Sequence, residues 1–264
     1  MTTYLDRIVA AHRAAAANDQ RSFDELFAQA QTQPDTRGFR RALRTVAEAG
    51  EIAVIAEIKR RSPSKGDLAI DCDAAEVARR YELGGAACLS VLTDEDFFAG
   101  SAIDLQTARN ACSLPVLRKD FTVDARDICD ARLMGADCVL LIAAALSDQE
   151  LREFSTIAQQ LNLDVLVEIH DEAELERALA IDADMIGVNQ RDLVTFQVDT
   201  ARAVRMASVM PSGVVRVAES GITGAADAKV LAEAGYHAVL VGEHLVTSEN
   251  SSELVSALRR ARSS

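Results

Sequence analysis

Long apolar runs, paired cysteines and an excess of positive charge are all missing from this chain of 264 residues. The longest apolar stretch runs only from Cys138 to Leu146, which is far too short to span a bilayer. The N-terminus carries Asp6 and Arg7 among its apolar residues and does not resemble a secretory signal. These absences predict a cytoplasmic protein without a membrane partner.

The five cysteines, at positions 72, 88, 112, 129 and 138, show no Cys-x-x-Cys pairing and have no histidine partner at metal-ligand spacing. Thiols of this kind in a cytosolic protein are usually reduced and buried. We therefore expect neither a disulfide nor a metal site.

Positive charge is scarce, with 28 Lys and Arg against 41 Asp and Glu and a net charge of −13. This balance argues against nucleic acid or an anionic membrane as a partner. An anionic substrate must therefore be held by a locally positive site, against an unfavourable overall field.

Eight short apolar runs recur along the chain, each followed by a polar, helix-like segment. They begin near Ile52, Ala87, Pro115, Asp137, Asp164, Asp184, Val214 and His237. Alternation of this kind predicts parallel βα units, and eight units in a chain of this length predict a closed (β/α)8 TIM barrel. An open doubly wound sheet is the alternative, because periodicity alone does not prove closure.

The first fifty residues stand outside the eight units and carry three helical stripes. The stripes are Leu5, Ile8, Val9 and His12, then Phe23, Leu26 and Phe27, then Phe39, Leu43 and Val46. Because such apolar faces need cover, we expect extra helices packed across one end of the barrel. The chain then forms one domain over residues 1–264, with a helical extension at 1–50 and the barrel core at 51–264.

Ionisable side chains lie inside or at the ends of the apolar runs, where an unpaired charge is costly. In a barrel the working groups project from the C-terminal ends of the strands, so one mouth would gather these residues. Acids and bases brought together there shift one another's pKa, as acid–base chemistry requires. The candidates are Glu57, Lys59, Lys119, Glu168 and Glu219, with Asn189 and Ser220 beside them.

Other interpretations of the charged residues stay open. Glu57 and Lys59 could form a structural pair without chemistry, since they lie on one strand face. The side chains of Arg118 and Arg216 are expected on the strand face opposite to that of the candidate residues, and we assign these two arginines no role. Three aspartates are as consistent with loop caps as with catalysis, namely Asp94, Asp120 and Asp192.

Two glycine-containing segments near the C-terminus are suited to phosphate. Ser220-Gly221-Ile-Thr-Gly224 follows the seventh run, and Val241-Gly242-Glu243-His244 follows the eighth. Backbone N–H groups at helix starts attract phosphate, and the loops after strands seven and eight are its usual place in a barrel. Ser62-Pro-Ser-Lys65-Gly66, after the first run, has the composition of a mobile loop, in which we interpret Lys65 as an ordinary surface residue.

Six ordered motifs resemble those of the indole-3-glycerol-phosphate synthase family, from the N-terminal helices to Gly242. The motifs are Ala-Glu57-Ile-Lys59-Arg-Arg-Ser62-Pro-Ser-Lys-Gly66, Ser90-Val-Leu-Thr-Asp-Glu-Asp-Phe-Phe-Ala-Gly100-Ser, Leu117-Arg-Lys119-Asp-Phe121, Leu166-Val-Glu168-Ile-His170, Gly187-Val-Asn189-Gln-Arg191-Asp-Leu and Ala218-Glu219-Ser220-Gly221-Ile. Departures are small. Gln190 stands where a second Asn is common, and Glu243-His244 replaces a pair of Ser or Glu followed by Ser or Ala.

The resemblance implies a phosphorylated small-molecule substrate, 1-(2-carboxyphenylamino)-1-deoxyribulose 5-phosphate. Its products would be indole-3-glycerol phosphate, CO₂ and water, formed without a metal or organic cofactor. Lys119 would protonate the ketone oxygen and Glu168 would be the base in dehydration. Lys59 would be a second acid or the partner of the substrate carboxylate, and the division between the two lysines stays open.

The remaining site residues take binding or positioning roles in the same resemblance. Glu57 would hold Lys59 and the substrate hydroxyls, Asn189 would position the reacting groups, and Glu219 belongs to the catalytic set. Substrate-binding positions are Ser62, Phe121 and Arg191, with Ser220, Gly221, Gly242 and Glu243 around the phosphate.

Two other functions compete with this one. Phosphoribosylanthranilate isomerase, another barrel enzyme with a phosphorylated sugar substrate, would use a Cys/Asp acid–base pair, whereas Lys and Glu end the strands here. A catalytically silent phosphate-binding subunit would not be expected to retain such costly charged residues. We expect a monomer or weak oligomer.

Overall fold

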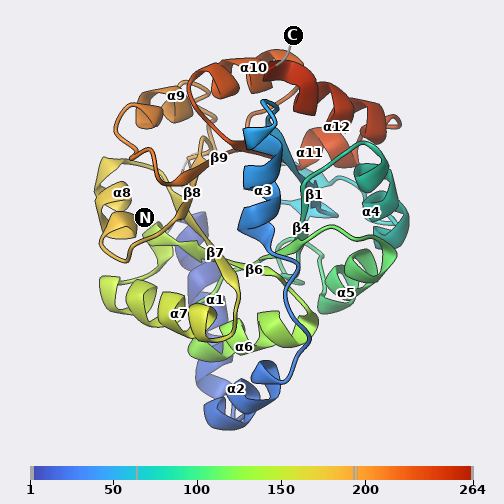
Figure 1. The fold of residues 1–264 in the computed structure, drawn as a ribbon. Coiled ribbons are helices and arrows are strands. Elements are labelled where there is room, and N and C mark those ends of the chain that lie inside the picture. Colours follow the sequence, from blue (N-terminus) through green and yellow to red (C-terminus); the bar gives the residue numbers. More distant parts are fainter. Residues whose placement is uncertain (1–2, 64, 193, 195, 263–264) are drawn as a thin grey trace.

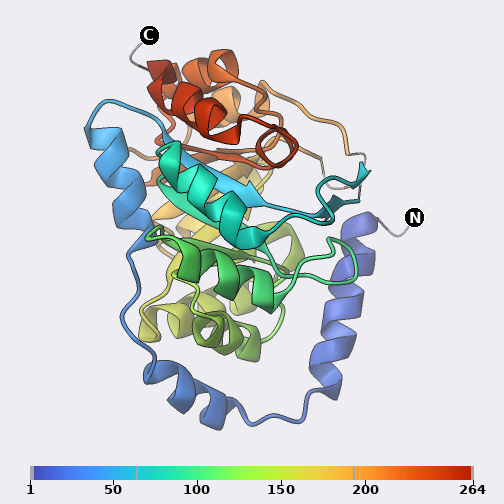
Figure 2. The same ribbon diagram turned by 90° about the vertical axis from the view of Figure 1, so that its right-hand side faces the viewer.

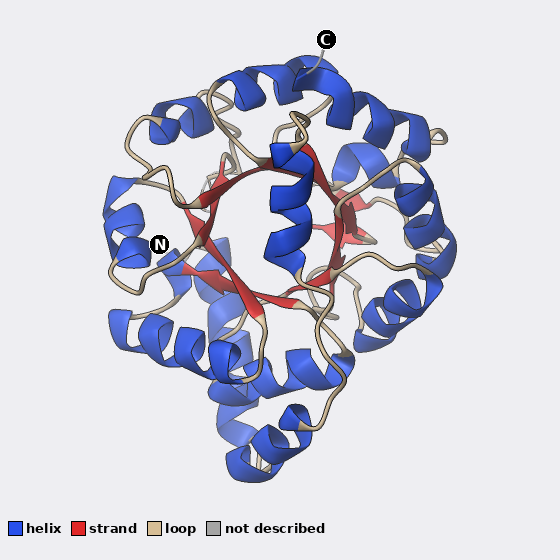
Figure 3. Ribbon diagram, in the orientation of Figure 1, coloured by secondary structure: helices blue, strands red, loops and turns tan. Residues whose placement is uncertain are grey.

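A computed structural model describes residues 3–63, 65–192, 194 and 196–262 of the chain. Eight parallel strands close into a barrel in which β1 pairs with both β4 and β10. The strands are β1 Ala53–Ile58, β4 Cys88–Leu92, β5 Val116–Lys119, β6 Cys138–Ile142, β7 Asp164–Ile169, β8 Met185–Asn189, β9 Val215–Glu219 and β10 Ala238–Val241. Figure 3 shows this ring of strands inside a ring of helices. The predicted (β/α)8 barrel is confirmed, and the open sheet is wrong.

Alternation along each strand divides the core into two layers. Ala53 and Ile55 of β1 belong to the buried cluster inside the barrel, whereas Val54 and Ala56 belong to the larger cluster under the helices. Leu117 of β5 likewise lies in the inner cluster. Because strand side chains alternate, Glu57 and Lys119 continue the inward-facing rows toward the C-terminal mouth. The strand parity thus positions the candidate site.

Helices cover the outside of the barrel. They are α4 Ala74–Leu83, α5 Ala102–Ala111, α6 Ala125–Met134, α7 Asp148–Gln160, α8 Glu172–Leu179, α9 Arg202–Ala207, α10 Ala225–Glu233, α11 Glu243–Val246 and α12 Ser251–Arg259, with 3-10 turns at Ala143–Ala145 and Arg260–Arg262. Gly135 ends α6 with a φ of +90°, a left-handed conformation that glycine adopts without strain. Within the described parts of the chain, no helix combines the length and apolarity needed to cross a membrane.

The N-terminal extension forms three helices, α1 Tyr4–Asn18, α2 Phe23–Gln31 and α3 Phe39–Glu48. Phe39 and Leu43 of α3 are fully buried in the inner cluster, so α3 closes the N-terminal end of the barrel. Tyr4, Leu5 and Ile8 of α1 instead line a cavity at the opposite end. Figure 2 shows α1 and α3 on opposite sides of the barrel, with α3 also visible across the opening in Figure 1. The expectation that the extension covers one end of the barrel is correct for α3 but wrong for α1, because each opening exposes apolar side chains that need a helix.

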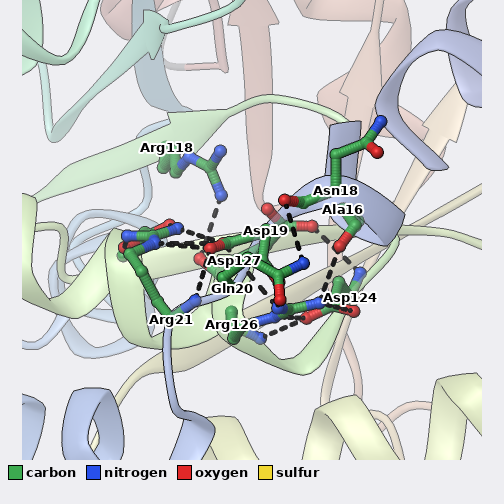
Figure 4. A network of polar contacts seen from close by, with 10 residues as sticks. Ala16, Asn18, Asp19, Gln20, Arg21, Arg118, Asp124, Arg126 and Asp127 are labelled. Carbon is green, nitrogen blue, oxygen red and sulfur yellow. Dashed lines mark hydrogen bonds and ion pairs between the residues drawn. The ribbon is translucent and has the colours of Figure 1, made fainter. Parts of the chain in front are cut away.

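Polar contacts attach the segment that links α1 with α2 to helix α6. The guanidinium of Arg126 donates to the carbonyl oxygens of Ala16 and Asp19, at 2.8 and 2.5 Å. Arg21 pairs with Asp130 of the same helix at 2.8 Å. Figure 4 shows these arginines converging on the end of α1. The C-terminal end of α1 is thus anchored independently of its contacts at the barrel mouth.

The segment after β1 contains a short antiparallel pair, β2 Arg61–Ser62 with β3 Gly66–Asp67, where the sequence indicated only a loop. A pair of two-residue strands is too short to leave a periodic pattern in the sequence. Ser64 and Leu193, which two of the quoted motifs contain, lie outside the described residues. All five cysteines are free thiols, and three of them are buried.

Candidate active site

A cavity of about 630 Å³ opens at the C-terminal ends of the strands, a volume typical of small-molecule sites. Every site residue predicted from the sequence lines it. The lining includes Glu57, Lys59, Ser62, Lys119, Phe121, Glu168, Asn189, Arg191, Glu219, Ser220, Gly221, Gly242 and Glu243. The barrel therefore brings together residues that lie almost two hundred positions apart in the chain, as the strand order requires.

Glu57 and Lys59 form a close ion pair inside the mouth. The Nζ atom of Lys59 lies 2.5 Å from Oε1 of Glu57, and Ser90 donates to Oε2 at 3.4 Å. Burial alone would raise the pKa of Glu57, but the charges of Lys59 and Lys119 outweigh it and lower the pKa. Glu57 is therefore an ionised group that holds Lys59 in position.

Lys119 lies between two carboxyl groups. Its Nζ atom is 3.6 Å from Oε2 of Glu168 and 3.8 Å from Oε2 of Glu219. Burial opposes the charge on Lys119, but Glu168, Glu219 and Glu57 together raise its pKa above the ordinary value. The lysine is consequently protonated at neutral pH, and its charge would repel a metal cation from these carboxylates.

Glu168 is held by one neighbour from β8 and by one that directly follows its own strand β7. Asn189 at the end of β8 donates to Oε1 at 3.0 Å, and Nε2 of His170 lies 3.7 Å from the same oxygen. Although burial raises the pKa of Glu168, the charges of Lys119 and His170 and the Asn189 hydrogen bond lower it overall. Glu168 is therefore ionised and able to accept a proton.

Glu219 has the opposite ionisation state. It is 1% exposed, and burial together with the charge of Glu168 raises the pKa of Glu219 to about 8, despite Lys119. A Cβ atom at position 187 would lie 2.0 Å from Oε1 of Glu219, so only glycine leaves room for this side chain. The site thus contains one neutral and one ionised carboxyl group beside the same ammonium, a separation typical of acid–base centres.

The loops after β9 and β10 form one end of the cavity. Ser220 and Gly221 both have positive φ, 67° and 73°, so the chain turns sharply just after Glu219. Gly242 precedes the short helix α11, and Glu243 faces Nζ of Lys65 at 3.9 Å. Lys65 was interpreted as an ordinary surface residue, but its side chain lines the cavity although more than half of it is exposed. A cation beside Glu243 offsets the negative charge at the expected phosphate end.

Aromatic and aliphatic side chains line another part of the cavity. Phe121, after β5, lies 6.2 Å from Phe98 between ring centroids. Tyr4 of α1 contacts Phe196 edge to face at 5.3 Å. The Arg191 guanidinium donates to the Phe196 carbonyl oxygen at 3.2 Å. These rings offer the flat apolar surface that an aromatic ligand needs.

Several residues in or beside the cavity received no role from the sequence. Ser90 and His170 contact acidic groups of the site. In the sequence, however, only the charged residues of the motifs were assigned catalytic roles. Phe98 occurs in the motif that follows the second strand, and the sequence does not show which way its ring points. Tyr4, Leu5 and Ile8 come from the N-terminal extension, and an amphipathic stripe shows which face is buried without showing where the helix docks.

Comparison with known proteins gives two findings. The family model described as indole-3-glycerol phosphate synthase matches residues 5–258. Among solved structures, the chain is similar to a thiamine phosphate pyrophosphorylase from Pyrococcus furiosus, with a TM-score of 0.60 and 16% identity, covering 80% of this chain and 95% of that one. At that identity the second likeness shows the barrel fold alone.

Proposed function

Because the chain belongs to the indole-3-glycerol phosphate synthase family, we propose that the cavity at the barrel mouth is its active site and that it works as a carboxy-lyase. The substrate would be 1-(2-carboxyphenylamino)-1-deoxyribulose 5-phosphate. The reaction joins an aromatic carbon to the ketone carbon, releases CO₂ and then releases water.

Ring closure requires a proton for the ketone oxygen. As the aromatic carbon that bears the carboxylate attacks, the carbonyl electrons move to oxygen. Lys119 is protonated and lies between Glu168 and Glu219, so it can deliver a proton to that oxygen as negative charge develops. A developing alkoxide is more basic than an amine, and the transfer is therefore favourable even from a lysine whose pKa is raised.

Loss of CO₂ restores aromaticity, and dehydration then needs both a base and an acid. Glu168 is ionised and is oriented by Asn189 at 3.0 Å, which suits it to remove the proton beside the departing hydroxyl. Lys59, held by Glu57 at 2.5 Å, can protonate that hydroxyl or pair with the substrate carboxylate before it leaves. The ionised Glu57 pairs with Lys59, and the neutral Glu219 lies beside Lys119.

The two ends of the cavity suggest the orientation of the substrate. Its phosphate would lie at Ser220, Gly221, Gly242 and Glu243, and its aromatic ring against Phe121. Arg191 and Ser62 would contact the carboxylate and the sugar. All of these residues come from one chain, and we propose that the protein acts as a monomer or weak oligomer on a free small molecule.

The observation that carries this function is the position of Lys119 between an ionised and a neutral carboxyl group inside the cavity at the barrel mouth. Its test is incubation of the protein with the carboxyphenylamino-ribulose phosphate, while indole absorbance and fluorescence are recorded. The chain contains no Trp, so indole emission would rise from a weak tyrosine background. An unchanged indole signal, together with consumption of phosphoribosylanthranilate, would support the rival isomerase instead.

A further inference from the structure

His12 of α1 reaches into a buried acidic pair beside the cavity. Its Nε2 atom lies 2.8 Å from Oδ2 of Asp94 and 3.9 Å from Oδ1 of Asp120. Asp94 follows β4 and Asp120 follows β5, and the two residues are only 4% and 5% exposed. One side chain from the N-terminal extension therefore connects two loops of the barrel mouth.

These two carboxylates hold the backbone of the cavity phenylalanines. Oδ1 of Asp94 accepts the N–H groups of Phe97 and Phe98, at 2.7 and 3.1 Å. Oδ1 of Asp120 accepts the N–H of Phe121 at 2.8 Å. The His12 ring itself packs against Phe121, with 5.5 Å between centroids. The network thus reaches Phe98 and Phe121, two of the rings that line the cavity.

Protonation of His12 reduces the net negative charge of this buried network. Arg118 is buried, pairs with Asp120 at 2.9 Å and donates to the carbonyl oxygen of Asp127 at 3.0 Å. One guanidinium against the carboxylates of Asp94 and Asp120 leaves a buried negative charge, which is costly unless a second cation meets it. The carboxylates and His12 lie close enough together to hold a metal, but the neighbouring guanidinium would repel a cation, so we interpret them as an ion-pair network.

The surroundings of His12 favour its charged form. Burial alone would lower its pKa, but the Asp94 hydrogen bond and the charges of Asp120 and Asp127 outweigh burial and raise the pKa above the ordinary 6.5. Arg118 faces Asp120 from β5, and the next residue of α1, Arg13, pairs outward with Glu150 at 2.7 Å. Deprotonation therefore occurs as the pH rises through this raised pKa.

We infer that the His12 imidazolium is a positioning residue, which holds Phe98 and Phe121 against the aromatic ring of the substrate through Asp94 and Asp120. This inference rests on the proposed use of the cavity as the active site. It assigns a task to α1 beyond covering the barrel. The chemistry at Lys119 and Glu168 does not pass through the network, so binding is affected more than turnover.

The first experiment compares His12→Gln with Arg13→Gln in the full-length protein. Gln keeps a hydrogen bond to Asp94 but cannot carry the charge, and we expect KM to rise roughly three- to tenfold with kcat changed less than about twofold. Arg13→Gln removes the neighbouring contact between α1 and α7, where Arg13 is 42% exposed, and KM should stay unchanged. Equal effects of the two substitutions would overturn the inference, since they would indicate only loosened docking of α1.

A pH series separates charge from packing. The ratio of the KM of His12→Gln to that of the wild type should be largest at low pH and fall toward one as the pH rises through the His12 pKa. Ionisation of the substrate phosphate and of His170 affects both proteins and cancels in the ratio. A ratio that stays constant from pH 6 to pH 9 would show that the protonated form of His12 has no part in binding.

A double-mutant cycle with Phe121→Leu tests the route of the effect. If His12 acts through this ring, the combined variant should lose less affinity than the product of the two single losses. Multiplicative losses would contradict the proposal. Wild-type turnover of the carboxyphenylamino-ribulose phosphate is measured first: its absence would refute the proposed function, whereas normal wild-type turnover with an unaffected His12→Gln would refute only the inference. Thermal unfolding of each variant checks that the fold is retained.

Discussion

The Nζ atom of Lys119 lies 3.6 Å from Oε2 of Glu168, close enough for ionic attraction but beyond ordinary hydrogen-bond length. An oxygen of the substrate that lies between Lys119 and Glu168 would contact each of them at a shorter distance than they have from each other. The proposed acid of ring closure and the proposed base of dehydration therefore serve one reacting centre, so the intermediate need not leave the site between steps. Because the two residues are proposed to act in different steps, the kinetics of single variants can distinguish their roles.

Lys119→Met is expected to abolish turnover while the fold is retained. Methionine is nearly isosteric with lysine but carries no proton to donate, and loss of a positioned general acid typically costs about 10²–10⁴-fold in rate. Steady-state kcat is the measurement, with circular dichroism and Tm as controls of folding. If the variant keeps more than a tenth of wild-type kcat, Lys119 is not the acid and Lys59 becomes the better candidate.

Glu168→Gln is expected to slow dehydration more than it weakens binding. The amide keeps the shape of the side chain and some hydrogen bonding with Asn189, but it cannot accept the proton. The value of kcat should therefore fall much more than KM rises. Rapid-quench analysis should reveal CO₂ released before indole appears. Normal kcat with a strongly raised KM would instead assign Glu168 to binding.

Strand positions and the inward-facing rows were predictable because each leaves a periodic signal. The predicted run near Ile52 and the observed start of β1 at Ala53 differ by one residue, and strand parity correctly placed Glu57 and Lys59 on one face. A parallel sheet covered on both sides produces continuous apolar runs, which is why all eight strands were found.

Features that depend on contacts between distant segments were not predictable. His12 was interpreted as one member of the α1 stripe, although its ring reaches Asp94, which is 82 residues away in the chain. The neutral state of Glu219 likewise depends on its burial in the barrel mouth and on the nearness of Glu168, which follows from the pairing of β7 and β9 with β8. Helix amphipathicity predicts a buried face, but it does not distinguish the end covered by α1 from the end covered by α3.

Glu219→Gln is expected to stabilise the protein and to impair catalysis. In the unfolded chain this carboxyl ionises near its ordinary pKa of 4.5, but in the folded protein it ionises near 8. Between these values the folded state binds more protons, so the free energy of unfolding falls as the pH rises from about 4.5 to about 8. Gln cannot ionise, so this fall in the free energy of unfolding does not occur in the variant. Its Tm at pH 8 should therefore rise by several degrees, at about 2–4 °C per kcal/mol for a chain of this size.

The matched control for this prediction is Glu57→Gln, for which the opposite sign is expected. The pKa of Glu57 is lowered, so its contribution to stability is present above the unfolded pKa and is lost as the pH falls through the folded one. Removal of that carboxylate should lower Tm at pH 7 and leave Lys59 without its partner. Glu219→Gln with a Tm gain at pH 4 as large as at pH 8 would show that packing rather than ionisation causes the effect.

Gly242→Ala is expected to damage both binding and turnover. A Cβ atom at this position would lie 2.2 Å from Oε1 of Glu57 and 3.0 Å from Nζ of Lys59, so even one methyl group displaces the ion pair. The same atom would hinder close approach of a phosphate to the backbone. Gly213→Ala is the matched control, because the added atom meets nothing within 4 Å and Gly213 precedes β9, away from the residues that line the cavity. We expect kcat to fall and KM to rise for Gly242→Ala, and both to stay near wild type for Gly213→Ala.

Glu243→Ala separates backbone from side-chain recognition at the same end of the cavity. If the phosphate is held mainly by N–H groups of Gly221, Gly242 and Glu243, the identity of side chain 243 matters little. Gly242 and Glu243 lie at the start of α11, where backbone dipoles stabilise an anion by roughly 0.3–1 kcal/mol and direct N–H bonds add more, whereas Gly221 lies in the turn before α10. The Glu243 carboxylate faces Lys65 at 3.9 Å, so Ala removes a negative charge and also frees a cation. These changes favour an anion, and KM should stay within a few-fold of wild type. A large rise of KM in Glu243→Ala, with Gly242→Ala tolerated, would make the side chain the contact and would contradict backbone recognition.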